Sequence, residues 1–222
     1  MIGEIQMTEK FIKNEQLNFI KKQITFIKDS KNKNVPKNVL ATVIDLANAK
    51  IVDLFPHLSD EQSEMLDVSK LKTESDYEQY IQHLSEYLLP FPIMTEQQLK
   101  KMFPKQKKLK LPDLSNIDHR QLTYLSWNDL RSNRKIIIYE LEGKMVGIEC
   151  EFSSTTKKNL CSFCNCFGEV SQISTVTKTK KTKNPDYYRS IGNYICADGS
   201  ECNKKMTNVD YLEGFLKDSL GI

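Results

Sequence analysis

The chain has 222 residues, of which 39% are hydrophobic and 27% charged, and its net charge is +3 at neutral pH. This composition excludes a disordered chain, a collagen and a coiled coil, and the length is sufficient for one large domain or two smaller ones. The longest apolar runs are too short to cross a bilayer, and the N-terminus lacks the basic start and apolar core of a secretory signal. We therefore expect a cytoplasmic protein with no membrane contact.

The first part of the chain has helical periodicity. Apolar residues recur every three or four positions over residues 8–29 and 37–55, which predicts two amphipathic helices. Ser59 and the glutamine three residues later form a capping box that opens a shorter helix, and Ser75 is expected to cap a fourth. Four amphipathic segments with short connectors can bury their apolar faces against one another, so we predict a four-helix bundle.

Two closely spaced prolines follow this pattern, and we place a domain boundary there, between residues 1–91 and 92–222. Thr95 begins a further capping box and a short helix. The lysine-dense stretch at 100–110 is open to two interpretations. It is either a contact for phosphate or an acidic protein, or a solvated helix end and linker.

The period of the apolar pattern changes to two in the second domain. Residues 135–152 predict a β-hairpin with a Glu-Gly turn and one face in water, and 170–177 and 193–195 predict two more strands. Thr207 or Asn208 is expected to cap the last helix. The fold class is therefore α+β, with a helical bundle followed by an α/β domain.

The six cysteines all lie in the last third of the chain, at Cys150, Cys161, Cys164, Cys166, Cys196 and Cys202. Cys161 and Cys164 have the C-x-x-C spacing of a zinc knuckle, and Cys196 and Cys202 would supply a second pair from a strand end and the turn before the last helix. This order is typical of a treble-clef zinc finger, and it predicts one structural Zn²⁺ held by four cysteines. A redox C-x-x-C or ordinary buried thiols would not explain the second pair.

Catalytic motifs are not found in the sequence. It has no G-x-S-x-G, phosphate-binding glycine loop, H-E-x-x-H or cytidine-deaminase pattern, and a four-cysteine metal site leaves no open coordination position. The three histidines, His57, His83 and His119, lie far from the cysteines in sequence. We expect no enzymatic activity and no small-molecule substrate.

Four segments together resemble one family. They are the stretch from Tyr87 to Pro112, the motif WNDLRSNRK that begins at Trp127, the knuckle CSFC, and the stretch YICADGSECNKKMTNVD that begins at Tyr194. In this order they are similar to the FusB-type fusidic acid resistance proteins and their relatives, the elongation factor G-binding proteins. The resemblance implies a cytoplasmic, monomeric protein with a helical bundle and a treble-clef domain. It also implies that the chain binds elongation factor G and promotes its release from the ribosome, including when fusidic acid has trapped it there.

The resemblance also implies contact residues for the factor. The family positions fall on Leu160, before the knuckle, on Tyr194 in the strand predicted at 193–195, and on Phe215 in the last helix. Phe215 also lies on an apolar stripe, so a role in the core is an equal alternative. We expect lysines, among them Lys157, Lys158, Lys178, Lys180 and Lys181, to surround these contacts and to steer association with an acidic partner.

A zinc-finger protein that binds RNA is the alternative function. The basic residues are concentrated in the second domain, which is the charge distribution that nucleic-acid binding requires. Few aromatic residues accompany the basic tracts, however, and the positive charge of this domain is modest. The sequence therefore favours binding to elongation factor G.

Overall fold

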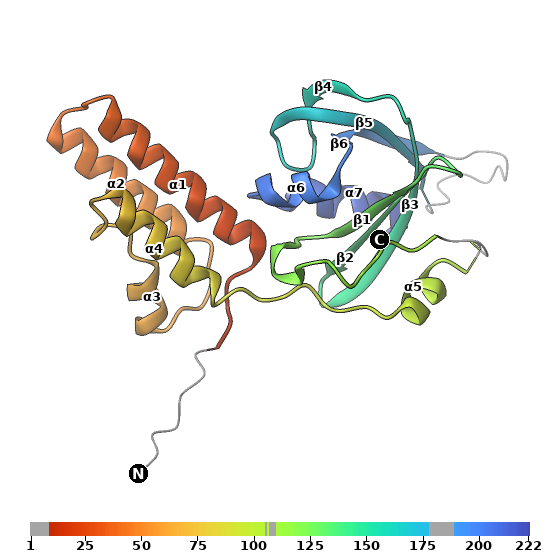
Figure 1. Cartoon of the computed structure of the whole chain (residues 1–222), viewed down its shortest axis with the longest axis horizontal. Coiled ribbons are helices and arrows are strands. Elements are labelled where there is room, and N and C mark those ends of the chain that lie inside the picture. Colours follow the sequence, from red (N-terminus) through yellow and green to blue (C-terminus); the bar gives the residue numbers. More distant parts are fainter. Residues whose placement is uncertain (1–8, 105, 107–109, 178–188) are drawn as a thin grey trace, which may run out of the picture. The chain divides into compact units, whose positions relative to one another are not determined.

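The computed structural model of the chain describes all residues except 1–8, 105, 107–109 and 178–188 (Figure 1). The chain divides into two compact units, Met1–Leu89 and Pro90–Ile222. None of the described helices combines the length and the apolar character that crossing a membrane requires.

The first unit contains four helices, α1 (Asn14–Asn32), α2 (Lys37–Val52), α3 (Asp60–Leu66) and α4 (Glu74–Ser85). Helix α1 packs against α2 and α4, and α3 packs against α2. Their apolar faces meet in one core, whose fully buried members include Ile12, Ile20, Ile27, Ile51, Leu66 and Leu84. The capping box predicted at Ser59 is present, since its side chain accepts a hydrogen bond from the amide of Gln62. The helical bundle predicted from the sequence is thus confirmed.

Two helix starts differ from the prediction. The first helix begins at Asn14 because the preceding segment is extended, and the amide of Ile12 donates to the carbonyl of Tyr87 at the other end of the unit. The fourth helix is capped by Thr73, not Ser75, because the Thr73 hydroxyl accepts the amide hydrogen bond of Asp76. The first start depends on a partner far away in the chain, whereas the second depends on a capping box that Thr73 forms with the nearby Asp76.

The second unit is built on a six-stranded antiparallel sheet. Its strands are β1 (Leu125–Asp129), β2 (Arg134–Leu141), β3 (Lys144–Phe152), β4 (Lys157–Leu160), β5 (Phe167–Val176) and β6 (Ser190–Cys196). The order is β1-β2-β3-β5-β4, and β6 also pairs with β5. The helices of this unit are α5 (Glu96–Met102), the short 3₁₀ helix η1 (His119–Gln121), α6 (Gly199–Lys205) and α7 (Asp210–Leu220).

The hairpin of β2 and β3 turns where the sequence predicts. Glu142 and Gly143 both have positive φ angles, of 51° and 75°, which is the backbone of a type I′ turn and favours glycine at the second position. Strands β1 and β4 and helix α6 were not expected, because each is short. The last helix begins at Asp210, with Val209 at its N-cap and the Asn208 side chain accepting the Asp210 amide.

Apolar cores lie on both faces of the sheet, so the predicted wet face of the hairpin is wrong along β2. Ile137 and Tyr139 pack into a core with α7, while Ile136 and Ile138 pack into a second core with α5. A side chain at Gly147 would place Cβ 2.3 Å from the Met102 sulfur, so glycine there allows the end of α5 to lie on β3. Local alternation does not reveal such a second covering layer.

Candidate metal centre and partner surface

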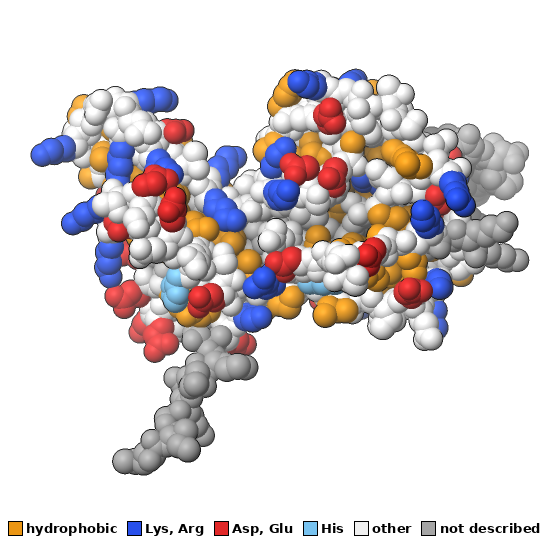
Figure 2. Space-filling view, in the orientation of Figure 1, with side chains coloured by type: hydrophobic (Ala, Val, Ile, Leu, Met, Phe, Trp, Pro, Cys, Tyr) orange, Lys and Arg blue, Asp and Glu red, His pale blue; other side chains and the backbone are white. Residues whose placement is uncertain are grey.

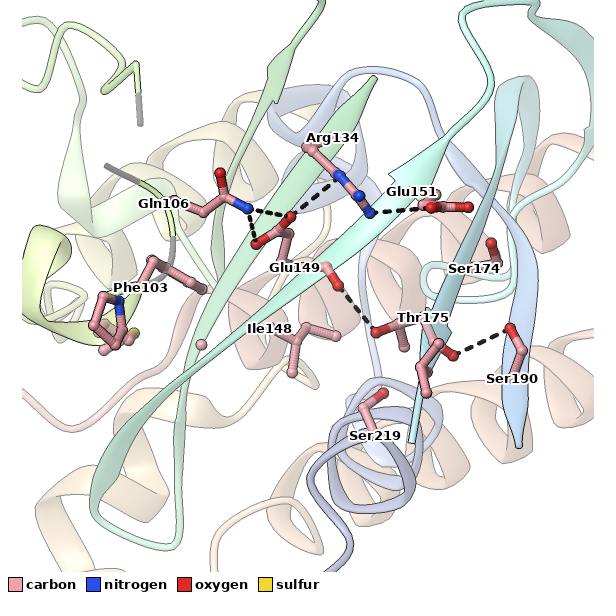
Figure 3. A pocket seen from close by; sticks show the side chains of 14 residues that line it. Phe103, Gln106, Arg134, Ile148, Glu149, Glu151, Ser174, Thr175, Ser190 and Ser219 are labelled. Carbon is pink, nitrogen blue, oxygen red and sulfur yellow. Dashed lines mark hydrogen bonds and ion pairs between the residues drawn. The ribbon is translucent and has the colours of Figure 1, made fainter. Parts of the chain in front are cut away.

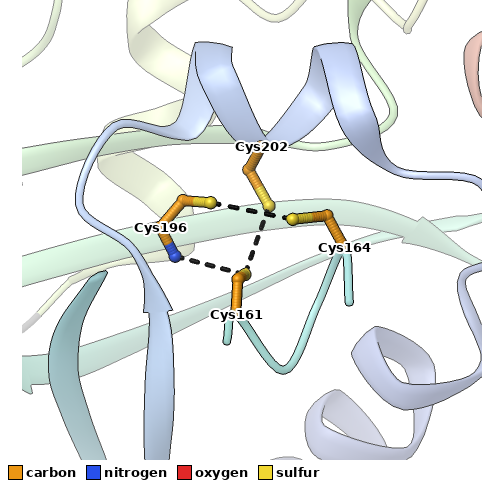
Figure 4. A group of neighbouring side chains, drawn as sticks. All are labelled: Cys161, Cys164, Cys196 and Cys202. Atoms are coloured by element: carbon orange, nitrogen blue, oxygen red, sulfur yellow. Dashed lines mark hydrogen bonds between the residues drawn. The ribbon is translucent and has the colours of Figure 1, made fainter. Parts of the chain in front are cut away.

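Four cysteines converge from three separate segments (Figure 4). Cys161 and Cys164 lie in the loop between β4 and β5, Cys196 ends β6, and Cys202 lies in α6. All four are buried, and their sulfur atoms lie within 4.8 Å of one another. The Cys161 and Cys202 sulfurs are 3.8 Å apart, and those of Cys164 and Cys196 are 3.7 Å apart. A tetrahedron with zinc–sulfur bonds of about 2.3 Å has edges of about 3.8 Å, so this spacing fits a four-thiolate zinc site.

The backbone holds the knuckle in this geometry. The Cys161 amide donates to the Cys166 carbonyl, the Asn165 amide donates to the Cys161 carbonyl, and Asn165 has a positive φ of 53°. The Cys196 amide donates to the Cys161 sulfur at 3.2 Å. A hydrogen bond from a backbone amide stabilises a thiolate, as a metal-bound sulfur requires.

Helix α6, which carries the fourth cysteine, is held next to the sheet by hydrogen bonds of one buried side chain, that of Asn203. The Asn203 carbonyl oxygen accepts the amides of Thr123, at 2.7 Å, and Tyr124, at 3.1 Å. Its side-chain amide donates to the carbonyls of Tyr124 and Gly199. Because Asn203 directly follows Cys202, these bonds set the position of the fourth sulfur.

The four thiols influence one another's ionisation. Hydrogen bonds from Cys164 first, and then from Cys196 and Cys202, lower the pKa of Cys161, while the neighbouring sulfur of Cys161 raises that of Cys202. Four thiolates so close together cannot all ionise unless a positive ion compensates them. The donor set, the spacing and the burial therefore fit Zn²⁺, which would be structural because all four positions are filled by protein.

A buried hydroxyl lies next to this cluster. Tyr124 is fully buried, and its hydroxyl lies near the Cys202 sulfur, without a hydrogen bond to any oxygen or nitrogen atom that the structure describes. Burial first, and then the nearby sulfur of Cys202, raises the pKa of Tyr124 well above its usual value. The hydroxyl therefore keeps its proton and is available as a donor to a metal-bound sulfur.

The remaining two cysteines stand outside the cluster. Cys150 is buried on β3, and burial raises its pKa to about 12, which keeps it a neutral thiol. Cys166 is half-buried beside the core of the second unit.

The residues expected to contact a partner occupy different environments. Leu160 is 50% exposed at the end of β4, where it pairs with Phe167 on β5. Tyr194 is half-buried, with the ammonium of Lys157 3.7 Å from its ring centroid. Phe215 is only 7% exposed and belongs to the core of the second unit. The candidate lysines Lys178, Lys180 and Lys181 lie outside the described residues.

Strand register separates Leu160 from Tyr194. Leu160 pairs with Phe167, whereas Tyr194 pairs with Gln172, five positions further along β5. Side chains alternate between the two faces of a strand, so an odd separation places the two pairs on opposite faces of the sheet. Lys157 pairs with Val170 and therefore shares the face of Tyr194.

Comparison with known proteins relates both units to one family. Residues 11–92 match the family described as "Elongation factor G-binding protein, N-terminal", and residues 101–214 match "FBP C-terminal treble-clef zinc-finger". A solved structure described as "Structure of the fusidic acid resistance protein FusC" is 30% identical, with a TM-score of 0.79 over 95% of this chain and 98% of that chain. The chain belongs to the FusB-type family of elongation factor G-binding proteins. No curated protein sequence matches it.

The fold class predicted from the sequence is confirmed for this FusB-type protein. The unit of four helices coincides with the N-terminal family match, and the sheet with its cysteine cluster coincides with the treble-clef match. The family relationship and the cluster geometry both point to a zinc finger in the second half of the chain.

Two exposed aromatic residues are further candidates for partner contact that the sequence analysis did not identify. Phe167 is 68% exposed opposite Leu160, and Tyr211 is 44% exposed and accepts a hydrogen bond from Asn193. Phe167 directly follows the cysteine-rich loop, which was a usable signal for a position beside the knuckle. No local pattern distinguishes Tyr211 from the apolar residues of α7.

A cavity of about 900 Å³ lies beside the end of α5, between strands β3 and β5 (Figure 3). Arg134 lies between Glu149, at 3.2 Å, and Glu151, at 3.3 Å, and the Gln106 side chain donates to both Glu149 oxygens. Thr175 donates to the backbone carbonyl of Glu149. These charges are paired with one another, so we assign no ligand to this cavity in the FusB-type protein.

Proposed function

We propose that this chain binds elongation factor G and promotes its release from the ribosome, and that it protects the factor's function against fusidic acid. The observation that carries the proposal is the four-sulfur cluster, which lies within a chain that matches the family over both units. The likeness to the fusidic acid resistance protein FusC over nearly the whole of both chains supports the resistance role.

The proposed mechanism is a coupling between two binding equilibria. A protein that binds the dissociated form of the factor more tightly than the ribosome-bound form shifts the factor away from the ribosome by that difference in affinity. No covalent step is needed. The chain would act as a monomer in the cytoplasm, where translation takes place, with residues 1–91 and 92–222 as separate domains.

One Zn²⁺ per chain would hold the finger together. Cys161, Cys164, Cys196 and Cys202 would bind it and so link the loop after β4, the end of β6 and helix α6. The ion would supply a crosslink between these three segments, which gives a partner a preformed surface.

We place the contact with the factor around strand β4, which is at an edge of the sheet. The exposed pair of Leu160 and Phe167 offers an apolar anchor, and Lys157 and Lys158 are exposed on the same strand. In Figure 2, hydrophobic and basic side chains lie together at the top of the second unit, where Figure 1 shows β4. Apolar anchors ringed by charges are typical of protein interfaces.

Tyr194 would contribute from the other face of the sheet. The Lys157 ammonium lies over its ring. A partner that binds around the edge strand β4 would therefore contact Leu160 on one face of the sheet and the pair of Lys157 and Tyr194 on the other. Phe215 would support this surface from the core without touching the partner, through its edge-to-face contact with Phe163 in the knuckle.

Kinetics on immobilised elongation factor G test the proposal. We expect the double substitution Leu160→Ala and Phe167→Ala to raise the dissociation rate about 30-fold, which corresponds to about 2 kcal/mol, and Tyr194→Ala to have a smaller effect. Leu130→Ala is the matched control, because Leu130 is equally apolar and 70% exposed in the turn after β1.

Three outcomes would count against parts of the proposal. If the unmodified chain fails to bind the purified factor, the function is wrong. If it binds but does not release the factor from fusidic acid-stalled ribosomes in a sedimentation assay, only the release step is wrong. Capture of RNA that is abolished by nuclease, without capture of the factor, would instead favour a nucleic-acid-binding protein.

A further inference from the structure

A lysine is buried beside the candidate metal centre. Lys135 on β2 is 1% exposed, on the face of the strand that carries Ile137 and Tyr139. Transfer of an ammonium group from water into a protein interior is costly unless an opposite charge is nearby. None of the ion pairs among the described residues includes Lys135, so no carboxylate fills that role at contact distance.

The contacts of Lys135 lead to the cysteine cluster. Its ammonium donates to the Asn128 side-chain oxygen and to the Ala197 carbonyl, each at 3.0 Å. The Asn128 side-chain amide donates to the same carbonyl at 3.1 Å. Ala197 directly follows Cys196, so the two side chains together hold the backbone at the third cysteine.

The spacing of the WNDLRSNRK motif explains why these two residues meet. Asn128 and Lys135 are direct partners in the register of β1 and β2, and residues 130–133 form the connecting turn, in which Asn133 has a positive φ of 51°. Lys135 is in turn the register partner of Cys150 on β3. The motif therefore places the Asn128 side-chain amide and the Lys135 ammonium next to each other, beside the finger.

The negative charge of the proposed zinc–thiolate centre can compensate the positive charge of Lys135. One Zn²⁺ with four thiolates carries a net charge of about −2, and this charge is buried with its ligands. Burial lowers the pKa of Lys135, and the nearby Cys202, Asp198 and Cys196 oppose this shift by favouring the charged form. The ammonium has no carboxylate at contact distance, and its hydrogen bond to the Ala197 carbonyl, directly after Cys196, places it close to the proposed dianionic centre.

We propose that Lys135, positioned by Asn128, is the buried counter-cation of the zinc–thiolate centre and that retention of the metal depends on its charge. The inference rests on the proposed zinc site. It assigns a physical role to the asparagine and the lysine of the motif, which the contact with elongation factor G does not use.

Transfer of zinc to a chromogenic chelator from the purified, zinc-loaded chain tests this role. Lys135→Met keeps a similar length without the charge, and we expect it to release zinc at least tenfold faster than the unmodified protein. Lys135→Arg, which keeps the charge, should be affected less. Lys144→Met is the matched control, because Lys144 is an exposed lysine on the neighbouring strand, and its release rate should be unchanged.

Comparison of the methionine and arginine variants, both zinc-loaded, separates charge from packing, because the second unit is expected to unfold without its metal. If Lys135 acts through its charge, Lys135→Met should release zinc faster, whereas Lys135→Arg, which changes the shape and keeps the charge, should release it at close to the unmodified rate. Equal acceleration by the two substitutions would overturn the inference and leave a packing role.

A second variant covers the case in which Lys135→Met does not fold. Asn128→Asp puts a carboxylate beside the ammonium. The lysine stays protonated, but the ion pair has no net charge with which to compensate the centre, so zinc release should again accelerate. An unchanged rate for a folded Asn128→Asp protein would overturn the inference. Absence of zinc from the unmodified protein would instead refute the metal site itself, a result that is distinguishable from either variant outcome.

Discussion

Cys196 is the residue at which the parts of the finger meet. It ends β6, its amide donates to the Cys161 sulfur at 3.2 Å, and its own sulfur lies 3.7 Å from that of Cys164. The carbonyl of the next residue, Ala197, accepts hydrogen bonds from Asn128 and Lys135. Loss of the Cys196 thiolate would therefore remove a metal ligand at the point where strand, knuckle and sheet are joined.

We expect Cys196→Ser to abolish stoichiometric zinc and to unfold the second unit, because metal binding contributes on the order of 10 kcal/mol to the folding of small zinc units. Elemental analysis measures the zinc, and circular dichroism the structure. Cys166→Ser is the control that should retain one zinc per chain, since Cys166 lies outside the cluster. A zinc-free but fully folded unmodified protein would contradict this prediction.

Phe215 illustrates how burial changes the meaning of a residue. Its ring is 5.8 Å from that of Phe163, at an interplanar angle of 65°, and only 7% of the residue is exposed. Phe163 lies between the two knuckle cysteines, so Phe215 supports the finger from α7. An effect of its substitution on partner binding would therefore include an effect on the fold of the finger.

Among the elements, helix α4 has a start that three hydrogen bonds define. The Thr73 hydroxyl accepts the Asp76 amide at 3.2 Å, and the Asp76 carboxylate accepts the amides of Thr73 and Lys72, both at 2.9 Å. The bond from Thr73 first, and then that from Lys72, lowers the pKa of Asp76. The contribution of this box to stability is complete above the ordinary carboxylate pKa, and it is lost as the pH falls through the lowered value.

Thr73→Ala should lower the free energy of unfolding of the first unit by about 1 kcal/mol, the usual cost of losing an N-cap. Ser75→Ala is the matched control, because the Ser75 hydroxyl accepts only an exposed side-chain hydrogen bond from Gln79, and its effect should stay within about 0.5 kcal/mol. Urea unfolding followed by far-ultraviolet circular dichroism measures both. Equal effects of the two substitutions would mean that the cap is not at Thr73.

On the scale of the whole molecule, the first unit has a core of its own. The buried apolar residues of α1 to α4 form one cluster, and an extended segment at Ile12 pairs with Leu88 to join the two ends of the unit. The second unit has two further cores, one on each face of its sheet, and the candidate metal centre lies in one of them. Each unit thus has its own means of stabilisation.

We expect a fragment of residues 1–91 to fold alone, with a helical spectrum and a cooperative thermal transition, because its apolar faces are buried within it. A fragment of residues 92–222 should lose its structure in the presence of a strong zinc chelator, while the first fragment should be unaffected. A gradual, non-cooperative transition of fragment 1–91 would show that its helices need the rest of the chain.

The sequence by itself determined the elements that depend on local chemistry. Helical periodicity identified the four helices, the capping boxes at Ser59 and Thr95 located two helix starts, and the Glu-Gly pair located the hairpin turn. The cysteine spacing indicated which four thiols cluster, because a knuckle and a second pair have few other uses in one short region. For the helix starts and the hairpin turn, the deciding interaction is within a few residues of the chain.

Only the tertiary structure decided which surfaces are covered. Alternation along β2 defines two faces, but the packing of α5 on the second face depends on residues far away in sequence. The same holds for Phe215, which is buried against the knuckle, and for Leu160 and Tyr194, which the register of β5 places on opposite faces. Burial and strand pairing are non-local, because they depend on which distant segments pack against a given surface. A local sequence pattern does not contain that information.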